Sequence, residues 1–517
     1  MARKTLTASI AALLLATTLP LGSIAEDVTE RHVTETHICC GGVIPESDEI
    51  VSKHIVTTEK LEKDGVVLRS SYPSQVDLST SPFFPPIGNQ GTIGSCAAFS
   101  TVYYQFTYEA NKLNDITTTA ENAYSPKQIY YYLCENTSNS GVRTSNVYSF
   151  LEDFGALRME DDPYVSQFDS SCPLYSDTTK MREALNTRLA DYTTIKIDFA
   201  SKITNPRSSN LNEVKAYLNS GKILRISTYL SFDIGVSGDG PVIYRCKVDE
   251  NRGHSMVIVG YDDSKSLDVN GNGTIEECEK GAFKIANSYG SEYGNEGYIW
   301  VLYDALNSAT TIPGDWEKSL NGTRAAVFAA GLPYNAFDAI VVCNYKVDYV
   351  AELNFQNVKR NNVYFYMQKE KNGVTKRNLV TAPKTPIVSS FTLVFDYFKV
   401  CSGVEADNCD FSLGVDLTGV AKNLSSGKIT DNRGNKIADL SSVANQEGSY
   451  RAPIDLIRGD VNYNGTITNA DVILVTRYCS GWDNLSNIQI YLADYNGDGK
   501  VTNTDVILMQ RYIANNS

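Results

Sequence analysis

The most informative segment of this chain reads Gln90-Gly91-Thr92-Ile93-Gly94-Ser95-Cys96-Ala97-Ala98-Phe99-Ser100. Its glycines allow tight backbone turns just before a run of apolar residues. These recur at spacings of three and four residues, at Phe99, Tyr103, Phe106 and Ala110. The spacing predicts an amphipathic helix that begins at Cys96 and continues to about Lys112.

Cys96 then lies at the N-terminus of the predicted helix. A helix N-terminus favours the thiolate, which is the form of cysteine that attacks carbonyl groups. Gln90 precedes the same helix, and its side-chain amide could donate to a developing oxyanion beside the backbone N–H of Cys96. The segment therefore predicts a nucleophilic cysteine with an oxyanion donor next to it.

A thiol nucleophile needs a base, and the chain offers four histidines. Three of them, His32, His37 and His54, lie in a polar N-terminal segment, so His254 is the candidate. His254 begins a strongly apolar run and is expected at the edge of a sheet. A lone histidine in such a place is more often structural, but the segment around Cys96 favours a catalytic role.

The base must also be held in one tautomer, and a side-chain carbonyl that accepts its second N–H can do this. Asn287 is the candidate, because it follows a predicted strand and precedes a turn rich in glycine and aromatic residues.

With these three segments in this order, residues 73–330 resemble the papain family of cysteine peptidases. The resemblance implies an α+β domain of two lobes with a polypeptide substrate between them. It also implies roles for four residues: Cys96 as nucleophile, His254 as general acid and base, Asn287 as orienting residue and Gln90 as oxyanion donor.

The resemblance further implies a disulfide between Cys134 and Cys172. Ala97 and Tyr289 stand where the family usually has tryptophan, and Tyr289 can still shield the hydrogen bond between Asn287 and His254 from water. Eleven cysteines in an exported chain leave at least one unpaired, and Cys96 is the thiol expected to stay free.

The N-terminus predicts export. Arg3 and Lys4 precede an apolar run, and small residues follow it, so residues 1–25 are expected to be a signal peptide. The run is too short and too interrupted for a membrane span. Residues 26–72 are polar and are interpreted as a pro-segment, with a disordered extension without inhibitory role as the alternative.

The bulk composition limits the partners. The length of 517 residues suggests three or four domains. A net charge of -14 disfavours nucleic acid, because no basic surplus is available to replace the counterions of phosphates. The same charge is compatible with bound cations.

Residues 336–450 change to a period of two, with Ala351, Leu353 and Phe355 alternating with polar residues. The alternation predicts an all-β, sandwich-like module. A spacer and a ligand-binding module both remain open for it.

Residues 454–517 contain an internal repeat in which Asp460–Tyr478 and Asp494–Tyr512 share 11 of 19 positions. Each copy places oxygen-bearing residues at the first, third, fifth, seventh and twelfth positions of a calcium loop, with glycine sixth. The candidate ligands are Asp460, Asn462, Asn464, Thr466 and Asp471 in the first loop, and Asp494, Asn496, Asp498, Lys500 and Asp505 in the second.

Paired loop-and-helix units that end in Asp resemble a dockerin, a small all-α module that binds cohesin modules of a scaffold protein. The resemblance implies two bound Ca²⁺ ions, an extracellular location in a cellulosome, and partner contacts at the tenth and eleventh loop positions. Those positions are Asn469, Ala470, Asn503 and Thr504. A generic EF-hand sensor is the alternative.

A third segment, 268–279, has the same spacing, with candidate ligands Asp268, Asn270, Asn272, Thr274 and Glu279. It would place a third Ca²⁺ between the predicted base and its orienting residue. The alternative is a solvated acidic turn. Taken together, the sequence predicts a secreted cysteine endopeptidase anchored to a scaffold, and the alternative is an inactive binding component with the same fold.

Overall fold

The computed structural model describes residues 43–44, 46–135, 139–196, 210–229, 231–236, 240–247, 253–269, 272–306, 336–345, 347, 349–371, 374–396, 410–417, 424–431, 434, 436–439, 450–453, 457–462, 466–483, 485 and 487–516. The predicted signal peptide lies outside the described residues. So do two of the candidate calcium ligands, Asn270 and Asn464.

Cys96 begins a continuous helical run, as predicted. The helix α3 (Cys96–Ala98) passes into η1 (Phe99–Phe106), which has π-helical hydrogen bonding, and then into α4 (Thr107–Leu113). Every residue of η1 is buried. The part of the run up to Asn111 is therefore buried on all sides, whereas the spacing of its aromatic residues predicted an amphipathic helix.

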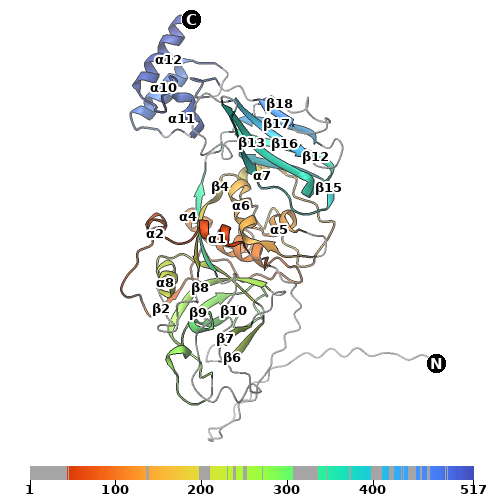
Figure 1. Cartoon of the computed structure of the whole chain (residues 1–517), viewed down its shortest axis with the longest axis vertical. Coiled ribbons are helices and arrows are strands. Elements are labelled where there is room, and N and C mark those ends of the chain that lie inside the picture. The colour runs from red at the N-terminus through yellow and green to blue at the C-terminus, as the bar shows by residue number, and fades with distance from the viewer. Residues whose placement is uncertain are drawn as a thin grey trace, which may run out of the picture. The chain divides into compact units, whose positions relative to one another are not determined.

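Further helices surround this central one (Figure 1). They are α5 (Lys127–Leu133), α6 (Thr144–Phe154), α7 (Thr178–Ala184) and α8 (Asn210–Asn219). The helices α5 and α6 pack against each other, and α6 also packs against the strand β4 (Thr187–Lys196).

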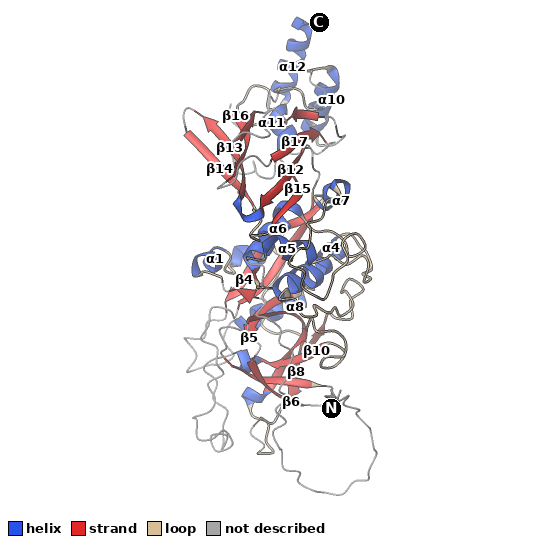
Figure 2. Cartoon of the chain, turned by 90° about the vertical axis from the view of Figure 1, so that its right-hand side faces the viewer, coloured by secondary structure: helices blue, strands red, loops and turns tan. Residues whose placement is uncertain are grey.

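A nine-stranded sheet carries the other half of the domain (Figure 2). Besides β4 it contains β2 (Gln75–Asp77), β5 (Leu224–Tyr229), β6 (Ser231–Val236), β7 (Pro241–Lys247), β8 (Gly253–Ser266), β9 (Lys280–Ala286), β10 (Tyr298–Leu302) and β11 (Ala336–Asn344). The order is β4-β11-β5-β8-β9-β10-β7-β6, with β2 paired to β8. This places β8, which begins with Gly253 and His254, near the middle of the sheet.

The strand β11 corrects one expected boundary. The sequence placed residues 336–344 in the all-β module, but β11 pairs antiparallel with β4 and β5. It therefore belongs to the first domain. Its period of two is the same as that of the following strands, and only its partners distinguish it.

The described part of 349–453 contains two four-stranded sheets. One has the order β15-β12-β17-β18 and the other β14-β13-β16-β19. The strands are β12 (Tyr349–Lys359), β13 (Val363–Lys371), β14 (Val374–Val380), β15 (Val388–Asp396), β16 (Asp410–Leu417), β17 (Leu424–Asp431), β18 (Lys436–Asp439) and β19 (Tyr450–Pro453).

Hydrogen bonds connect these strands to the helical part of the first domain. Arg360, which is fully buried, donates to the carbonyl oxygen of Cys172 at 3.0 Å. The hydroxyl of Tyr132 donates to the carbonyl of Thr381 at 2.8 Å. A buried guanidinium must be satisfied by hydrogen bonds, so these contacts fix the edge of the module to the helices.

The C-terminal region contains α10 (Asn469–Cys479), α11 (Asn487–Ala493) and α12 (Asn503–Asn516). Thr468 and Asp471 form a capping box at the start of α10, as the sequence predicted. The two repeats share one small core, because Val472 and Val475 of α10 cluster with Met509 of α12. Among the described residues, no helix is long and apolar enough to cross a membrane.

Candidate active site

His254 and Asn287 form the central contact of the site. The ring Nε2 of His254 lies 2.8 Å from Oδ1 of Asn287. The same Oδ1 accepts a hydrogen bond from the backbone N–H of Ser288, so it is the acceptor of the pair. His254 therefore carries its proton on Nε2, which leaves Nδ1 as the basic nitrogen.

Neighbouring aromatic residues enclose this contact. The ring of Tyr289 stacks on His254 at a centroid distance of 4.9 Å. The hydroxyl of Tyr104, on the central helix, donates to the carbonyl oxygen of Asn287 at 2.7 Å. Both His254 and Asn287 are 1% exposed. The ring of Tyr289 thus lies against His254, where it can shield the hydrogen bond to Asn287 from water.

Cys96 is the first residue of α3 and is buried. Its helix is joined to the strand that carries His254, because the hydroxyls of Ser100 and Ser255 share a hydrogen bond of 2.7 Å. Ser100 follows Cys96 by one helical turn, and Ser255 is next to His254. The structure thus brings the helix of the predicted nucleophile against the strand of the predicted base.

Gln90 lies in the loop that leads to Cys96. Its Nε2 donates to the carbonyl of Ile93 at 2.8 Å, and its Oε1 accepts from the hydroxyl of Ser288. An amide nitrogen carries two hydrogens, so the bond to Ile93 uses one of them. Ser288 also follows Asn287 directly, which links the predicted oxyanion donor to the predicted orienting residue.

Burial controls the charge of the base. It lowers the pKa of His254 to about 4, and the hydrogen bond that His254 donates to Asn287 opposes this only in part. A thiolate close to Nδ1 would favour the charged imidazolium and raise the pKa again. The buried histidine is therefore neutral until a negative charge develops beside it.

The N-terminal segment lies directly over this region. The strand β1 (Val43–Ile44) pairs in parallel with β3 (Val142–Arg143), which precedes α6. The carbonyl oxygen of Val43 approaches Gly253 so closely that a Cβ there would lie 2.8 Å from it. Gly253 immediately precedes His254, so the segment crosses from the helical lobe to the strand of the predicted base.

The predicted disulfide between Cys134 and Cys172 is not formed in the structure. Cys172 is a buried thiol whose Sγ donates to the carbonyl of Pro173 at 3.6 Å. The Sγ of Cys134 instead contacts Ser140, whose carbonyl accepts at 3.6 Å. Both sulfurs have polar backbone partners, which replace the expected covalent bond.

The second C-terminal loop is built around two buried carboxylates. Asp494 accepts the backbone N–H of Asp498 at 3.1 Å and that of Gly499 at 2.9 Å. Asp505 accepts the backbone N–H of Asn496 at 3.2 Å and that of Thr502 at 2.8 Å. The two aspartates are 4% and 0% exposed. Burying such charges is costly without a counter-charge, and oxygen ligands of this kind suit Ca²⁺.

The first C-terminal loop repeats the arrangement where it is described. Asp471 accepts the backbone N–H of Asn462 at 2.8 Å and that of Thr468 at 2.9 Å. Asp460 and Asp471 are 6% and 0% exposed. Within the described residues no three His, Cys, Asp or Glu side chains gather as metal ligands, so amide and main-chain oxygens would complete each site.

The loop 268–279 has a similar internal pattern. Asp268 accepts the backbone N–H of Gly273 at 2.8 Å. Glu279 is fully buried and accepts from the backbone N–H of Val269 and of Glu276, at 2.8 and 2.9 Å. Burial, together with Glu276, raises the pKa of Glu279 to about 7. The first and last candidate ligands therefore turn into the loop.

The predicted partner positions are exposed at the starts of α10 and α12: Asn469, Ala470, Asn503 and Thr504. The structure adds two residues that the sequence reasoning missed. Ile473 and Ile507, at matching positions of the two repeats, are 58% and 48% exposed. An apolar residue repeated at a position outside the helix core was the signal that could have found them.

A cysteine at the start of a buried helix that packs against the strand of a histidine, which is itself held by an asparagine, is the arrangement of a thiol-dependent hydrolase. Residues 72–312 match the family model of the papain family cysteine protease, and residues 458–514 match the dockerin type I domain. These matches support a cysteine-type peptidase of the papain family in residues 72–312 and a dockerin type I domain in residues 458–514.

Curated relatives agree with the first assignment. Cysteine protease XCP2 of Arabidopsis thaliana is 26% identical over 231 residues, which are 44% of this chain and 54% of that protein. Cathepsin K of Gallus gallus is 26% identical over 235 residues, 44% of this chain and 59% of that protein. The chain thus spans little more than half the length of these relatives.

Solved structures were also found at lower similarity. Xylellain, a cysteine protease from Xylella fastidiosa, has 20% identity and a TM-score of 0.38, with 59% of this chain and 96% of that chain covered. Procathepsin L2 from the larval midgut of Tenebrio molitor has 16% identity and a TM-score of 0.38, with coverage of 59% and 79%.

Proposed function

We propose that this protein is a secreted cysteine endopeptidase that cleaves peptide bonds through an acyl-enzyme on Cys96. The observation that carries the proposal is the hydrogen bond from Nε2 of His254 to Oδ1 of Asn287. It fixes the tautomer in which Nδ1 can accept a proton. The alternative of an inactive binding component is not favoured.

The proposed reaction uses the groups of the site in turn. Nδ1 of His254 takes the thiol proton of Cys96, and the thiolate attacks the carbonyl carbon of the scissile bond. The oxyanion accepts hydrogen bonds from the backbone N–H of Cys96 and from the amide of Gln90. His254 then protonates the leaving amine, and a water molecule, deprotonated by the same ring, hydrolyses the thioester.

Covalent labelling tests this proposal. A peptide with an electrophilic carbon at its cleavable end should alkylate one cysteine in the processed protein, and peptide mapping should find it at Cys96. Excess substrate should protect that residue, whereas iodoacetamide in denaturant should label Cys172 equally in protected and unprotected samples. Alkylation that is spread over several thiols and insensitive to substrate would contradict the assignment.

The contacts of the N-terminal segment support its proposed role as a pro-segment that blocks the site. Two ion pairs hold its helix α2 (Thr58–Lys63) on β4, from Lys60 to Asp191 at 3.2 Å and from Lys63 to Asp191 at 2.8 Å. His54, after α1 (Asp48–Lys53), stacks on Tyr192 at 3.7 Å. Since the Val43 carbonyl of β1 lies against Gly253, next to His254, removal of the segment would uncover this part of the site.

Acidification should release this segment. Burial, followed by the charge of Lys60, lowers the pKa of His54 below its ordinary value of 6.5. The docked segment therefore prefers a neutral His54. Its docking is fully favourable above pH 6.5 and weakens as the pH falls through the lowered pKa, because the released segment binds the proton more readily.

Hydrogen exchange of residues 46–64 at pH 7.5 and pH 5 measures this effect, and the protection of these amides, relative to the intrinsic rate at each pH, should fall at the lower pH. His54→Phe keeps the stacked ring but cannot titrate, so its pH dependence should be flatter than that of the unaltered chain. The same pH dependence in both proteins would show that His54 is not the group involved.

We further propose that Ca²⁺ binds at both dockerin loops and at the loop 268–279. When bound, the ion would supply the positive charge that the buried Asp505 and Glu279 need. The repeated pattern, in which backbone N–H groups turn the first and last carboxylates inward, supports the third site.

The third site can be tested in a full-length chain whose dockerin loops are disabled by Asp471→Asn and Asp505→Asn. Addition of Ca²⁺ should then raise the melting temperature of the peptidase domain by several degrees, since a ligand that binds only the folded state stabilises it. Glu279→Gln in the same background should abolish the rise. An equal rise in both proteins would exclude this loop.

The dockerin is proposed to bind a cohesin module of a scaffold protein and so to hold the peptidase in an extracellular, cellulosome-associated complex. The exposed first turns of α10 and α12 support two equivalent contact surfaces, extended by Ile473 and Ile507. The bonds made by Arg360 favour a structural attachment for the β-module.

A further inference from the structure

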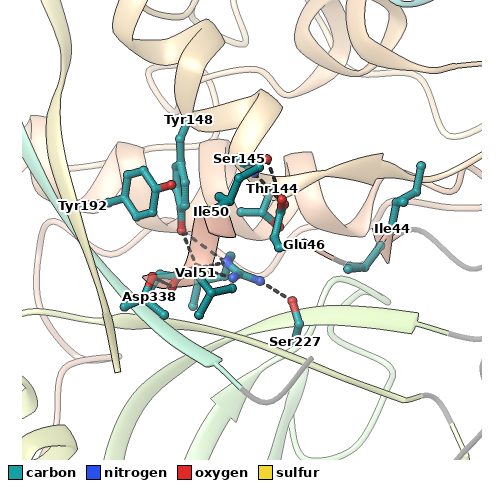
Figure 3. A pocket seen from close by; sticks show the side chains of 13 residues that line it. Ile44, Glu46, Ile50, Val51, Thr144, Ser145, Tyr148, Tyr192, Ser227 and Asp338 are labelled. Atoms are coloured by element: carbon teal, nitrogen blue, oxygen red, sulfur yellow. Dashed lines mark hydrogen bonds and ion pairs between the residues drawn. The ribbon is translucent and has the colours of Figure 1, made fainter. Parts of the chain in front are cut away.

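A pocket with several polar groups in a largely apolar lining lies under the N-terminal segment, between α6 and three strands of the large sheet (Figure 3). Its lining includes Glu46 from the segment, Ser145 and Tyr148 from α6, Ser227 from β5 and Asp338 from β11. Arg225 of β5 also faces it. The pocket is therefore covered by residues that the proposed processing would remove and formed by residues that would stay.

Two of the remaining residues form a closed ion pair. Arg225 and Asp338 are both buried, and Nε of Arg225 lies 3.0 Å from Oδ2 of Asp338. Asp338 also accepts from the hydroxyls of Thr194 at 2.7 Å and Tyr148 at 3.1 Å. The carboxylate is thus fully engaged, and the pair adds no net charge to the pocket.

Glu46 places a second carboxylate in the same pocket. Its Oε1 accepts the backbone N–H of Ser145 at 2.8 Å, and its Oε2 accepts the hydroxyl of Ser145 at 2.6 Å. Ser145 lies in the first turn of α6, a helix of 11 residues whose positive end favours an anion. Arg143 at the cap position makes no side-chain capping bond. The carboxylate that binds this helix end therefore belongs to a residue 99 positions away from Ser145 along the chain.

The pocket is close to the predicted reaction centre. Ser227 pairs with Ser255 across the sheet, and Thr228 pairs with His254. The segment that carries Glu46 also includes β1, which pairs with β3 and whose Val43 carbonyl approaches Gly253. A polypeptide that takes the place of this segment could therefore put one of its side chains where Glu46 now lies.

Departure of the segment changes the charge of the pocket. With Glu46 in place, the lining holds two carboxylates and one guanidinium. Without it, Arg225 and Asp338 cancel, and the first turn of α6 presents an N–H and a hydroxyl with no acceptor from the segment. A carboxylate restores both hydrogen bonds, whereas an amide matches them less well and an ammonium is repelled.

We propose that this pocket is a substrate subsite for an acidic side chain, that Ser145 is its specificity-determining residue and that Glu46 occupies it before processing. This inference rests on the proposed peptidase function and names part of its substrate class. Glutamate is the preferred residue, because the side chain of Glu46 already shows that its length suits both hydrogen bonds to Ser145.

Cleavage of matched peptides tests the proposal. Sets that carry Glu, Gln, Leu or Lys at each position around the scissile bond should show one position where kcat/KM for Glu exceeds that for Gln by about tenfold, as expected for hydrogen bonds to a charged group. Ser145→Ala should reduce this ratio toward one, and Ser145→Thr, which retains the hydroxyl, should keep it. Thr179→Ala, a change at the same position of α7, should leave the ratio intact.

A second measurement does not depend on cleavage. In the full-length Cys96→Ala chain, Glu46→Gln and Ser145→Ala should each increase hydrogen exchange of residues 46–53 by about tenfold. The double variant should add little, because both changes remove the same contact. Unchanged exchange in Glu46→Gln, or a Glu-to-Gln ratio that Ser145→Ala does not alter, would overturn the subsite. Those results would leave the peptidase proposal standing. If no peptide is cleaved but both variants show the expected increase in exchange, the peptidase function alone would be rejected.

Discussion

Replacement of Cys96 by alanine should abolish peptide cleavage by the processed protein. The predicted fall in kcat is on the order of 10⁶, which is the loss seen when a covalent nucleophile is removed from a peptidase. This fall in kcat is expected because Cys96 is the thiol at the start of the helix that packs against the strand of His254. Progress curves with a fluorogenic peptide, at substrate concentrations above KM, measure the effect.

Two controls make the result specific. Cys96→Ala should retain the far-ultraviolet circular dichroism and melting profile of the unaltered chain to within a few degrees, because alanine fills most of the buried space and fits the helix. Cys172→Ser, which preserves a donor to the carbonyl of Pro173, should cleave at the original rate. Retained cleavage by Cys96→Ala would place the nucleophile elsewhere.

The sequence predicted the parts of the site that depend on local chemistry. A helix start at Cys96 could be read from glycines followed by periodic aromatic residues, and the structure has that helix. The choice of His254 rested on the small number of histidines, and the structure joins it to Asn287. Cys96 is recognisable from its neighbours along the chain, whereas His254 is recognisable because few histidines compete with it.

Long-range partners could not be read in this way. The strand β11 resembles those of the following module in its alternation, and only its pairing with β4 reveals its domain. The contact between Glu46 and Ser145 likewise depends on how the segment crosses the cleft. Alternation and capping preferences indicate what kind of group a residue can bond to. The pairing of strands and segments in the folded chain determines which group it is.

The same limit explains the absent disulfide. A resemblance gives the sequence positions at which two cysteines usually meet, but a bond forms only when the two Cβ atoms are close and correctly directed. Here Cys172 lies beside the buried guanidinium of Arg360, whose bond to the carbonyl of Cys172 comes from the following module. A contact between domains thus fixes the backbone where the family pattern predicted a covalent link.

Both functional domains contain polar groups whose binding partner can be exchanged. In the peptidase, Arg225 and Asp338 are compensated within the fold, while Ser145 is matched by a removable residue. In the dockerin, the carboxylates of Asp471 and Asp505 are held inward by backbone N–H groups. A cation that binds beside such a carboxylate supplies the opposite charge that its burial requires.

Loss of calcium from the dockerin should therefore abolish capture by a cohesin. Asp505→Ala removes a carboxylate that accepts from Asn496 and Thr502 and would bind the ion. The two repeats share a core between α10 and α12, so one damaged loop should disorder both contact surfaces. We expect the affinity to fall at least about 100-fold, because an ion present at 100 times its Kd stabilises the bound fold by about 2.7 kcal/mol.

Contact residues should behave differently from calcium ligands, and the contrast provides the decisive measurement. Calorimetric titration with a recombinant cohesin should show little loss when only Asn469 and Ala470 are changed, or only Asn503 and Thr504, because the second repeat offers an equivalent surface after a half-turn. Changing all four should abolish binding while calcium still raises the melting temperature of the module. If Asp505→Ala alone leaves cohesin binding intact, the repeats fold independently, and the shared core is not what couples calcium to docking.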